Sequence, residues 1–248
     1  MSDSAEIRTF TTPQELFAGS AEEVFRAAED AVEARGRFTI ALSGGSTPKS
    51  LYNLLATNAR YALPWEQMYF FWGDERHVPP NDPESNFRMA NEAMLSKIPV
   101  PAENVFRVPA ENPDAAAAAE AYGETLRKFF ASEAGQFPSF DLILLGIGPD
   151  GHTASLFPGT AALQEKSRLV VANWVEKFKT NRITFTLPLL NAARKVVFLV
   201  SGTDKAPALH AILEGNQPGE QYPAKLVRPV DGKLIWLVDR AAASGLAI

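Results

Sequence analysis

The chain lacks cysteine altogether in its 248 residues. This absence excludes disulfide bonds, thiolate metal ligands and a cysteine nucleophile, and it suits a reducing compartment. No stretch approaches the roughly 18 consecutive apolar residues that a membrane-spanning helix needs. The first residues, Met1 to Glu6, also lack the basic and apolar regions of a signal peptide. We therefore expect a cytoplasmic protein with no membrane partner.

The sequence also has no excess of positive charge. The 24 Lys and Arg residues against 29 Asp and Glu residues give a net charge of −5, so general electrostatics do not favour a nucleic-acid partner. No internal repeat and no linker divides the sequence. A chain of this length buries about 70 to 75% of its unfolded surface, enough for a full core without metals or disulfides. We expect one domain spanning residues 1–248, as a monomer or small homo-oligomer.

Apolar runs alternate with helical patterns along the chain. A capping box at Thr12-Pro13-Gln14-Glu15 begins the first helix. The alternation predicts right-handed β-α-β units and an α/β fold with a mostly parallel sheet flanked by helices on both faces. The interval between residues 174 and 182 is too short for a helical crossover, so it predicts one short antiparallel pairing. The expected strands span 38–42, 68–72, 105–108, 141–146, 169–174, 182–187, 195–200 and 234–238, and the later helices span 49–55, 85–95, a segment from 115, and 203–213.

A glycine-rich turn, Ser43-Gly44-Gly45-Ser46-Thr47-Pro48, joins the first expected strand to a helix. Gly44 and Gly45 allow the backbone to approach an anion, and Thr47 is suited to capping the helix beside Ser46. Free N–H groups and the helix dipole then favour phosphate. A ligand-free strand-to-helix turn is equally compatible with this pattern. The Gly-Lys-Ser/Thr ending of a P-loop is absent.

Two further strand ends carry cations. Gly73-Asp74-Glu75-Arg76-His77 follows the strand 68–72, and the planar fork of Arg76 suits phosphate. A surface salt-bridge cluster is the alternative. Lys205 lies in the first turn of an expected helix, where a cation opposes the helix dipole unless an anion binds there. Arg182 opens a strand and is either a ligand contact or a surface residue.

One of only three histidines, His152, follows the buried strand 141–146 in the segment Asp150-Gly151-His152. A neutral imidazole near a carboxylate is a natural general base for hydrolysis. A structural histidine bonded to a backbone carbonyl is the alternative. We expect His210 to be structural, because it lies on a helix with an apolar face, and His77 is left open. No serine lies in a Gly-x-Ser-x-Gly elbow, which disfavours serine catalysis.

These motifs, in this order, resemble the 6-phosphogluconolactonase family over nearly the whole chain. The resemblance implies a Rossmann-like sheet and hydrolysis of 6-phospho-D-glucono-1,5-lactone to 6-phosphogluconate, a step of the pentose phosphate pathway, without a cofactor or metal. The segments that carry it are Ser43-Gly44-Gly45-Ser46-Thr47-Pro48, Trp72-Gly73-Asp74-Glu75-Arg76, the run from Gly146 to Gly159, and Gly202-x-x-Lys205-Ala206.

The resemblance also separates this chain from a related deaminase. Glucosamine-6-phosphate deaminases carry a Glu before the proline of the histidine motif, where this chain has Phe157, and a Tyr where it has Arg76. Both differences favour lactone hydrolysis over amino-sugar chemistry. A non-catalytic sugar-phosphate sensor is the other alternative, but the continuous, acidic α/β pattern leaves no room for a basic DNA-binding segment.

The mechanism implied by these residues is a general-base hydrolysis. We expect His152 to take a proton from the water that attacks the lactone carbonyl, with Asp150 orienting the ring. Arg76 and Lys205 are expected to hold the phosphate, and Arg182 and the glycine-rich turn to assist them. Asp74 is expected to shape the pocket near the sugar hydroxyls or to position Arg76. Backbone amides of the turn or of the Gly151 region are the candidate oxyanion donors.

Overall fold

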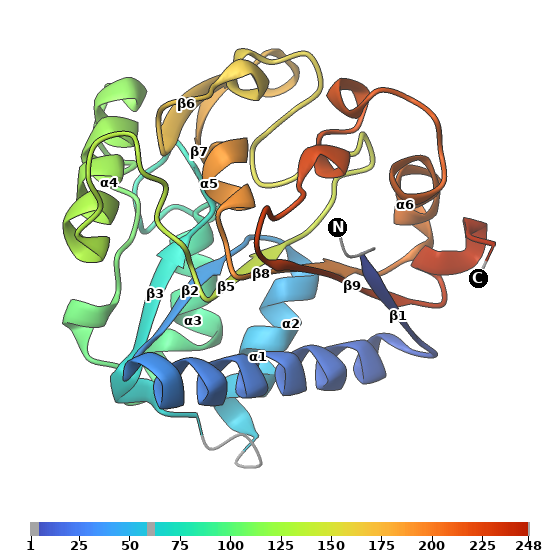
Figure 1. Cartoon of the computed structure of the whole chain (residues 1–248), viewed down its shortest axis with the longest axis horizontal. Coiled ribbons are helices and arrows are strands. Elements are labelled where there is room, and N and C mark those ends of the chain that lie inside the picture. Colours follow the sequence, from blue (N-terminus) through green and yellow to red (C-terminus); the bar gives the residue numbers. More distant parts are fainter. Residues whose placement is uncertain (1–4, 59–62, 248) are drawn as a thin grey trace.

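In the computed structural model, which describes residues 5–58 and 63–247, two sheets form the framework of the fold (Figure 1). The larger sheet has six strands in the order β1-β9-β8-β5-β2-β3, and all its pairings are parallel. Its strands are β1 (Glu6–Phe10), β2 (Phe38–Leu42), β3 (Met68–Trp72), β5 (Leu142–Leu145), β8 (Lys195–Val200) and β9 (Lys233–Asp239).

The smaller sheet is antiparallel and has the order β4-β7-β6. Its strands are β4 (Asp74–Arg76), β6 (Val170–Val175) and β7 (Thr180–Phe185). The short interval between β6 and β7 therefore forms the antiparallel pairing that the sequence predicts.

Helices cover both faces of the larger sheet. In Figure 1, α1, α2 and α3 lie on one side, whereas α4, α5, α6 and the smaller sheet lie on the other. The helices are α1 (Pro13–Arg35), α2 (Ser46–Thr57), α3 (Asn86–Ala93), α4 (Ala115–Phe130), α5 (Leu187–Asn191) and α6 (Ala206–Leu213). Short 3-10 helices are η1 (Trp65–Gln67), η2 (Leu95–Lys97), η3 (Ala102–Asn104), η4 (Ala161–Gln164), η5 (Glu176–Phe178), η6 (Thr203–Lys205), η7 (Gly219–Gln221), η8 (Pro223–Leu226) and η9 (Ala242–Gly245).

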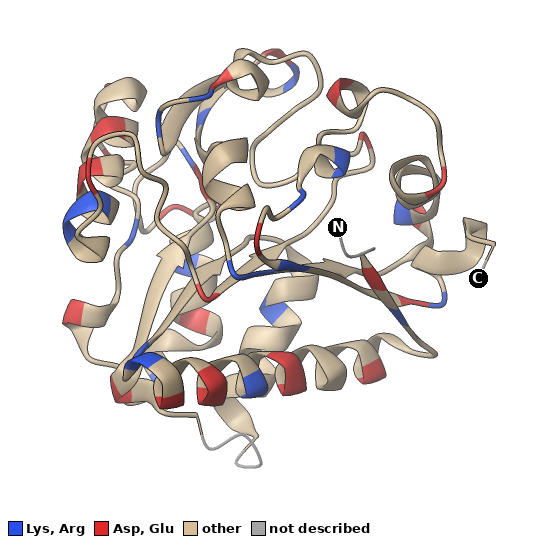
Figure 2. Cartoon of the chain, viewed as in Figure 1, with Lys and Arg blue, Asp and Glu red and all other residues tan. Residues whose placement is uncertain are grey.

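The central strands are apolar because both of their faces are covered. Every residue of β2 and β5 is buried, and β5 lies between β2 and β8 in the sheet. One half of the predicted capping box forms, since the Glu15 backbone N–H donates to Thr12 Oγ1 at 3.2 Å and Pro13 begins α1. The Glu15 carboxylate accepts instead from the Thr11 backbone N–H at 2.8 Å. Charged residues of both signs lie along α1 (Figure 2). Within the described residues, no helix is both long and apolar enough to cross a membrane.

Several details differ from the sequence-based expectations, among them α5, which was not expected and begins at the last residue of the expected strand 182–187. The edge strand β1 was not expected. The segment 105–108 is not a strand, since it contributes only an isolated bridge from Val105 to Phe70. Residues Asp74–Arg76, for which no strand was expected, form β4 because they pair with β7. The cap of α2 is Gly45, with no side-chain cap, so Thr47 lies inside the helix and does not cap it.

Candidate active site

The carboxyl ends of the parallel strands bring the predicted motifs to one edge of the larger sheet (Figure 1). Strands β2, β5 and β8 are neighbours or next neighbours in this sheet. The glycine-rich turn follows β2, the segment with His152 follows β5, and the Gly202 segment follows β8. Ligands in open α/β sheets bind outside the carboxyl ends of the strands, so this edge is the candidate site.

His152 and Asp150 form a hydrogen-bonded pair in the loop after β5. The His152 Nδ1 atom lies 2.5 Å from Asp150 Oδ1. Since an ionised carboxylate only accepts, Nδ1 carries the proton and Nε2 of the neutral ring has the free lone pair. The partner is therefore a carboxylate, not the backbone carbonyl of the structural alternative. This is the orientation that a general base needs.

Packing fixes the imidazole ring. It stacks on Phe157 with ring centroids 4.1 Å apart at an angle of 24°. The ring also lies against Gly148, where an added Cβ atom would be 2.1 Å from His152 Nδ1 and Cε1. The side chain is still 24% exposed, so an incoming water molecule can reach the loop.

The electrostatics of Asp150 favour the ionised carboxylate. The hydrogen bond from His152 lowers the pKa of Asp150 well below its usual range and outweighs the opposing effect of partial burial. Lys177 Nζ, 3.6 Å from Asp150 Oδ2, acts in the same direction. Asp150 is consequently a fixed negative charge that can stabilise a protonated His152.

Asp74 connects the histidine segment to the glycine-rich turn. Its buried carboxylate accepts a hydrogen bond from Ser155 Oγ at 2.6 Å. Its backbone carbonyl accepts one from Asn86 Nδ2 at 3.0 Å. Asn86 in turn lies so close to Gly44 that a Cβ atom there would be 2.0 Å from its Oδ1 atom. These contacts place Asp74 between two loops of the candidate site, and its predicted role near the sugar hydroxyls or Arg76 stays a prediction.

Glu75 is a buried anchor that the sequence analysis did not single out. Its carboxylate accepts hydrogen bonds from the backbone N–H groups of Asn86 at 2.7 Å and Phe87 at 2.8 Å, and from Ser85 Oγ at 3.1 Å. It also accepts one from the Arg76 backbone N–H at 2.8 Å. Burial raises the pKa of Glu75 against the effect of these donors. Since Asp74 and Glu75 are both buried, the cluster is not a solvated surface face.

Two arginines lie side by side on neighbouring strands of the smaller sheet. Arg76 on β4 is the register partner of Arg182 on β7. Arg76 Nη1 donates to the Glu84 carbonyl at 2.7 Å. Burial, followed by the nearby Arg76 charge, lowers the pKa of Arg182. Among the described residues neither guanidinium forms an ion pair, so the two cations together are suited to an anion.

Buried polar atoms without a partner also gather near this edge. In the described part of the chain they are Ser43 Oγ, Trp72 Nε1 and Arg182 Nε. Ser43 follows β2, Trp72 ends β3, and Arg182 lies beside β4. Buried polar groups are normally hydrogen-bonded, so unpaired ones need an explanation. A polar ligand or bound water at this edge provides one. For Ser43 and Trp72, the position at the end of a predicted strand was the one feature of the sequence that could have indicated a place in the site.

Lys205 lies at the same edge but has a local partner. Its Nζ atom is 3.1 Å from Asp204 Oδ2. The neighbouring carboxylate accounts for a cation at the start of α6 without any ligand. Among the described residues no hydrogen bond or ion pair joins Lys205 to His152 or Arg76. Its assignment to the phosphate therefore stays a prediction.

The other two histidines have structural partners. His77 Nε2 lies 2.6 Å from the carbonyl oxygen of Asn112. His210, on α6, pairs with Glu214 one turn further along at 3.0 Å. Within the described residues no group of three or more His, Asp or Glu side chains could hold a metal ion.

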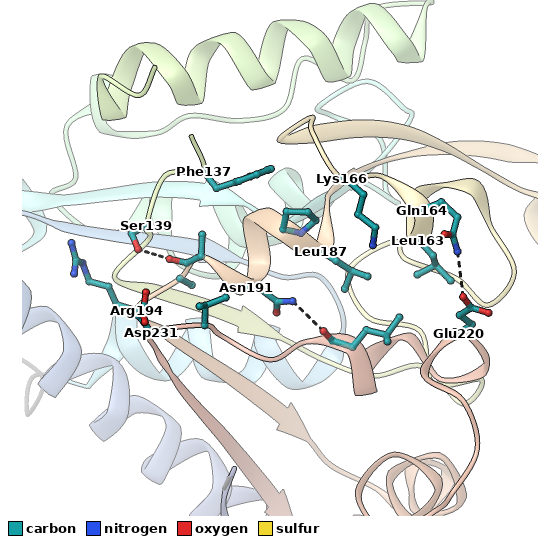
Figure 3. Close-up of a pocket in the computed structure, with 15 residues that line it drawn as sticks. Phe137, Ser139, Leu163, Gln164, Lys166, Leu187, Asn191, Arg194, Glu220 and Asp231 are labelled. Atoms are coloured by element: carbon teal, nitrogen blue, oxygen red, sulfur yellow. Dashed lines mark hydrogen bonds between the residues drawn. The ribbon is translucent and has the colours of Figure 1, made fainter. Parts of the chain in front are cut away.

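A separate hollow of about 700 Å³ lies away from this edge (Figure 3). Part of its lining, including Ser139, Arg194 and Asp231, comes from the segments that precede β5, β8 and β9, at the amino ends of these strands. The rest comes from η4, α5, η7, η8 and neighbouring residues. Ser139 Oγ donates to the Ala192 carbonyl, and Asn191 Nδ2 donates to the Leu226 carbonyl at 3.1 Å. Since Ser139 and Asn191 are already paired and none of the predicted motifs lines the hollow, it is a weaker candidate for chemistry than the opposite edge.

The fold and this edge together define an α/β protein with a hydrogen-bonded His–Asp pair after β5 and two arginines on the smaller sheet. Residues 11–236 match the family described as Glucosamine-6-phosphate isomerases/6-phosphogluconolactonase. The chain belongs to this family.

Individual relatives agree with this membership. The chain is 44% identical to the 6-phosphogluconolactonase of Nostoc sp. over 94% of this chain and 95% of the relative. It is 50% identical to that of Synechocystis sp. over 87% and 88%. Among solved structures, the 6-phosphogluconolactonase from Trypanosoma cruzi has a TM-score of 0.89 at 30% identity, covering 100% of this chain and 99% of the other. The predicted Rossmann-like α/β fold is confirmed.

Proposed function

We propose that this protein hydrolyses 6-phospho-D-glucono-1,5-lactone to 6-phosphogluconate in the oxidative branch of the pentose phosphate pathway. The relatives named 6-phosphogluconolactonase, at 44% and 50% identity, support this assignment. The observation that carries it is the Asp150–His152 pair at the carboxyl edge of the sheet, with the two arginines on the adjoining smaller sheet. The cysteine-free composition suits the cytoplasm, which we propose as the location of this protein. We further propose that it is a monomer or small homo-oligomer and that it acts on a small molecule rather than on nucleic acid.

The chemical step begins at His152 Nε2. This atom accepts a proton from water as the oxygen attacks the C1 carbonyl of the lactone, and Asp150 stabilises the imidazolium that forms. The tetrahedral oxyanion then collapses, the bond from C1 to the ring oxygen breaks, and the imidazolium returns its proton to that oxygen. Backbone N–H groups at the start of α2, near Ser46, or near Gly151 are the proposed oxyanion donors, because the first N–H groups of a helix lack intrahelical partners.

The phosphate provides the binding energy. Arg76, Arg182 and Lys205 are its proposed ligands, with the turn from Gly44 to Thr47 beside them. Binding a group remote from the reacting carbon fixes the carbonyl in front of the base and contributes to rate through orientation. Neither arginine has a carboxylate partner among the residues that the structure describes, which supports this role.

The rival amino-sugar chemistry lacks a carboxylate at the required place. Phe157 occupies the position before Pro158, and its ring is buried and stacked on His152. An apolar ring cannot transfer protons during ring opening, whereas lactone hydrolysis needs no second acid at this position.

A coupled assay tests the proposed function. Glucose-6-phosphate dehydrogenase generates the lactone in situ, and acid release is followed against the spontaneous background. We expect catalysed acid release with this lactone and no ammonia from glucosamine 6-phosphate. Ammonia release without lactone hydrolysis would establish the deaminase instead.

A further inference from the structure

The tip of the β6–β7 hairpin reaches both parts of the candidate site. It consists of η5, which contains Lys177 and Phe178. Lys177 approaches Asp150, and Phe178 lies between Phe157 and Arg182. We propose that Lys177 and Phe178 are positioning residues, which hold the Asp150–His152 pair and the Arg182 guanidinium in their working orientations. This inference rests on the proposed function, which it extends to a hairpin tip outside the ends of the parallel strands.

Lys177 acts on the carboxylate. One oxygen of Asp150 accepts the proton of His152 Nδ1, and the other lies 3.6 Å from Lys177 Nζ. Contacts on both oxygens fix the plane of the carboxylate, and this plane sets the direction of the imidazole. The charged groups that face Asp150 are His152 from its own loop and Lys177 from η5. Without Lys177 the carboxylate is held from one side only.

Phe178 acts on the arginine and, through a second ring, on the histidine. Its ring centroid lies 5.2 Å from Arg182 Cζ and 5.8 Å from the Phe157 ring, which it meets edge-on at 76°. Phe157 in turn stacks on His152. Phe178 is nonetheless 45% exposed, so its ring contributes these contacts rather than filling the core. Cation–π and edge-to-face contacts of this kind favour one orientation of each partner.

The same hairpin offers a matched control. Trp174 on β6 is 51% exposed, and its Nε1 atom donates to Glu176 at 2.8 Å. Within the described part of the chain, its indole makes no ring contact or hydrogen bond to Asp150, His152 or Arg182. Trp174→Ala removes a large exposed aromatic ring from the hairpin without touching the site, so it reports any general effect of disturbing this element.

The experiment compares Phe178→Ala, Phe178→Tyr and Lys177→Gln with Trp174→Ala. In the coupled lactone assay we expect Phe178→Ala to raise KM by about fivefold. This change corresponds to the free energy of one half-exposed cation–π contact. Phe178→Tyr keeps the ring and should retain the wild-type KM. Lys177→Gln should lower kcat by about two- to fivefold, as for an exposed ion pair, with little change in KM. Trp174→Ala should match the wild type.

A spectroscopic measurement makes the test independent of turnover. The exchange of the His152 Nδ1 proton with water is followed by NMR, and its signal is assigned by its loss in His152→Asn. We expect faster exchange in Lys177→Gln and Phe178→Ala and unchanged exchange in Trp174→Ala.

The two readouts separate the possible failures. If the wild type does not hydrolyse the lactone, the proposed function fails, while the exchange rates still decide the positioning role. Exchange rates in Lys177→Gln and Phe178→Ala equal to those in Trp174→Ala overturn the inference. A Phe178→Tyr variant as impaired as Phe178→Ala overturns the argument from the ring contacts.

Discussion

A single added methyl group at Gly148 should disable the candidate site. The backbone of Gly148 lies directly against the His152 ring, and a Cβ atom there would be 2.1 Å from Nδ1 and Cε1. The same atom would be 2.8 Å from Asp150 Oδ1. Gly148 does not adopt a positive φ angle, so alanine is acceptable to the backbone itself. We therefore expect the substitution to act first on the Asp150–His152 pair.

The size of the effect follows from the distances. Ordinary contact of a Cβ atom begins at 3.4 Å, so the ring has to move by about 1.3 Å to accommodate Gly148→Ala. The ring cannot move away freely, because Phe157 stacks on it. A misplacement of about 1 Å can lower a rate by about 100-fold. We expect a loss of this order in kcat, with KM changed much less because the phosphate ligands are untouched.

The assay is the initial rate of lactone hydrolysis, and Gly146→Ala is the control. Gly146 lies two residues earlier in the same loop, and the nearest atom to a Cβ there is the Leu199 carbonyl oxygen at 3.8 Å. This is an ordinary contact, so Gly146→Ala should keep near-normal activity. Equal kcat values for Gly148→Ala and Gly146→Ala, with both proteins folded, would show that the position of the His152 ring does not limit the reaction.

Three further predictions concern the remaining parts of the site. Arg76→Ala and Lys205→Ala should each raise KM by about 10- to 100-fold, the value of hydrogen bonds to a charged group, with a smaller effect on kcat; unchanged KM values in both would refute the phosphate assignment. Asp150→Asn should reduce stability at pH 7, since a lowered folded-state pKa contributes stability above the unfolded value of about 3.9. That contribution is lost as the pH falls through the folded-state pKa, so urea midpoints of the wild type and Asp150→Asn should converge in acid; a constant difference would contradict the assigned cause. Glu75→Gln should lower the free energy of unfolding by about 2 to 3 kcal/mol, because a buried carboxylate that accepts four hydrogen bonds is lost; a wild-type urea midpoint would exclude the anchoring role.

The buried strands could be predicted from the sequence almost residue by residue. The apolar runs 38–42, 68–72 and 195–200 coincide with β2, β3 and β8. A central strand covered on both faces is apolar throughout, and such a run has a clear beginning and end in the sequence. The lengths of the intervening segments then distinguished the parallel crossovers from the β6–β7 hairpin.

Elements that depend on distant partners could not be predicted in this way. β1 is a largely exposed edge strand that is ordered by pairing with β9 near the other end of the chain. β4 consists of Asp74, Glu75 and Arg76, which have no strand-like pattern, and it exists because β7 pairs with it. The segment 105–108 has an apolar pattern, but its Phe106 N–H reaches only the Phe70 carbonyl, so no ladder forms.

The residues of the candidate site also fall into those that the sequence could indicate and those that depend on distant partners. His152, Asp150 and Arg76 were predictable because polar residues at the ends of buried strands meet at one edge. The contacts of Lys177 and Phe178 were not, since they are made by a hairpin tip that approaches the loop only in the folded chain. The same applies to the anchoring of Glu75 by α3.

The most direct test of the central claim is the kcat of His152→Ala on enzymatically generated lactone, measured beside the wild type at neutral pH. If Nε2 of this imidazole accepts the proton of the attacking water, kcat falls by at least about 100-fold while KM stays close to the wild-type value. A folded His152→Ala protein that turns over the lactone at nearly the wild-type kcat would contradict the claim.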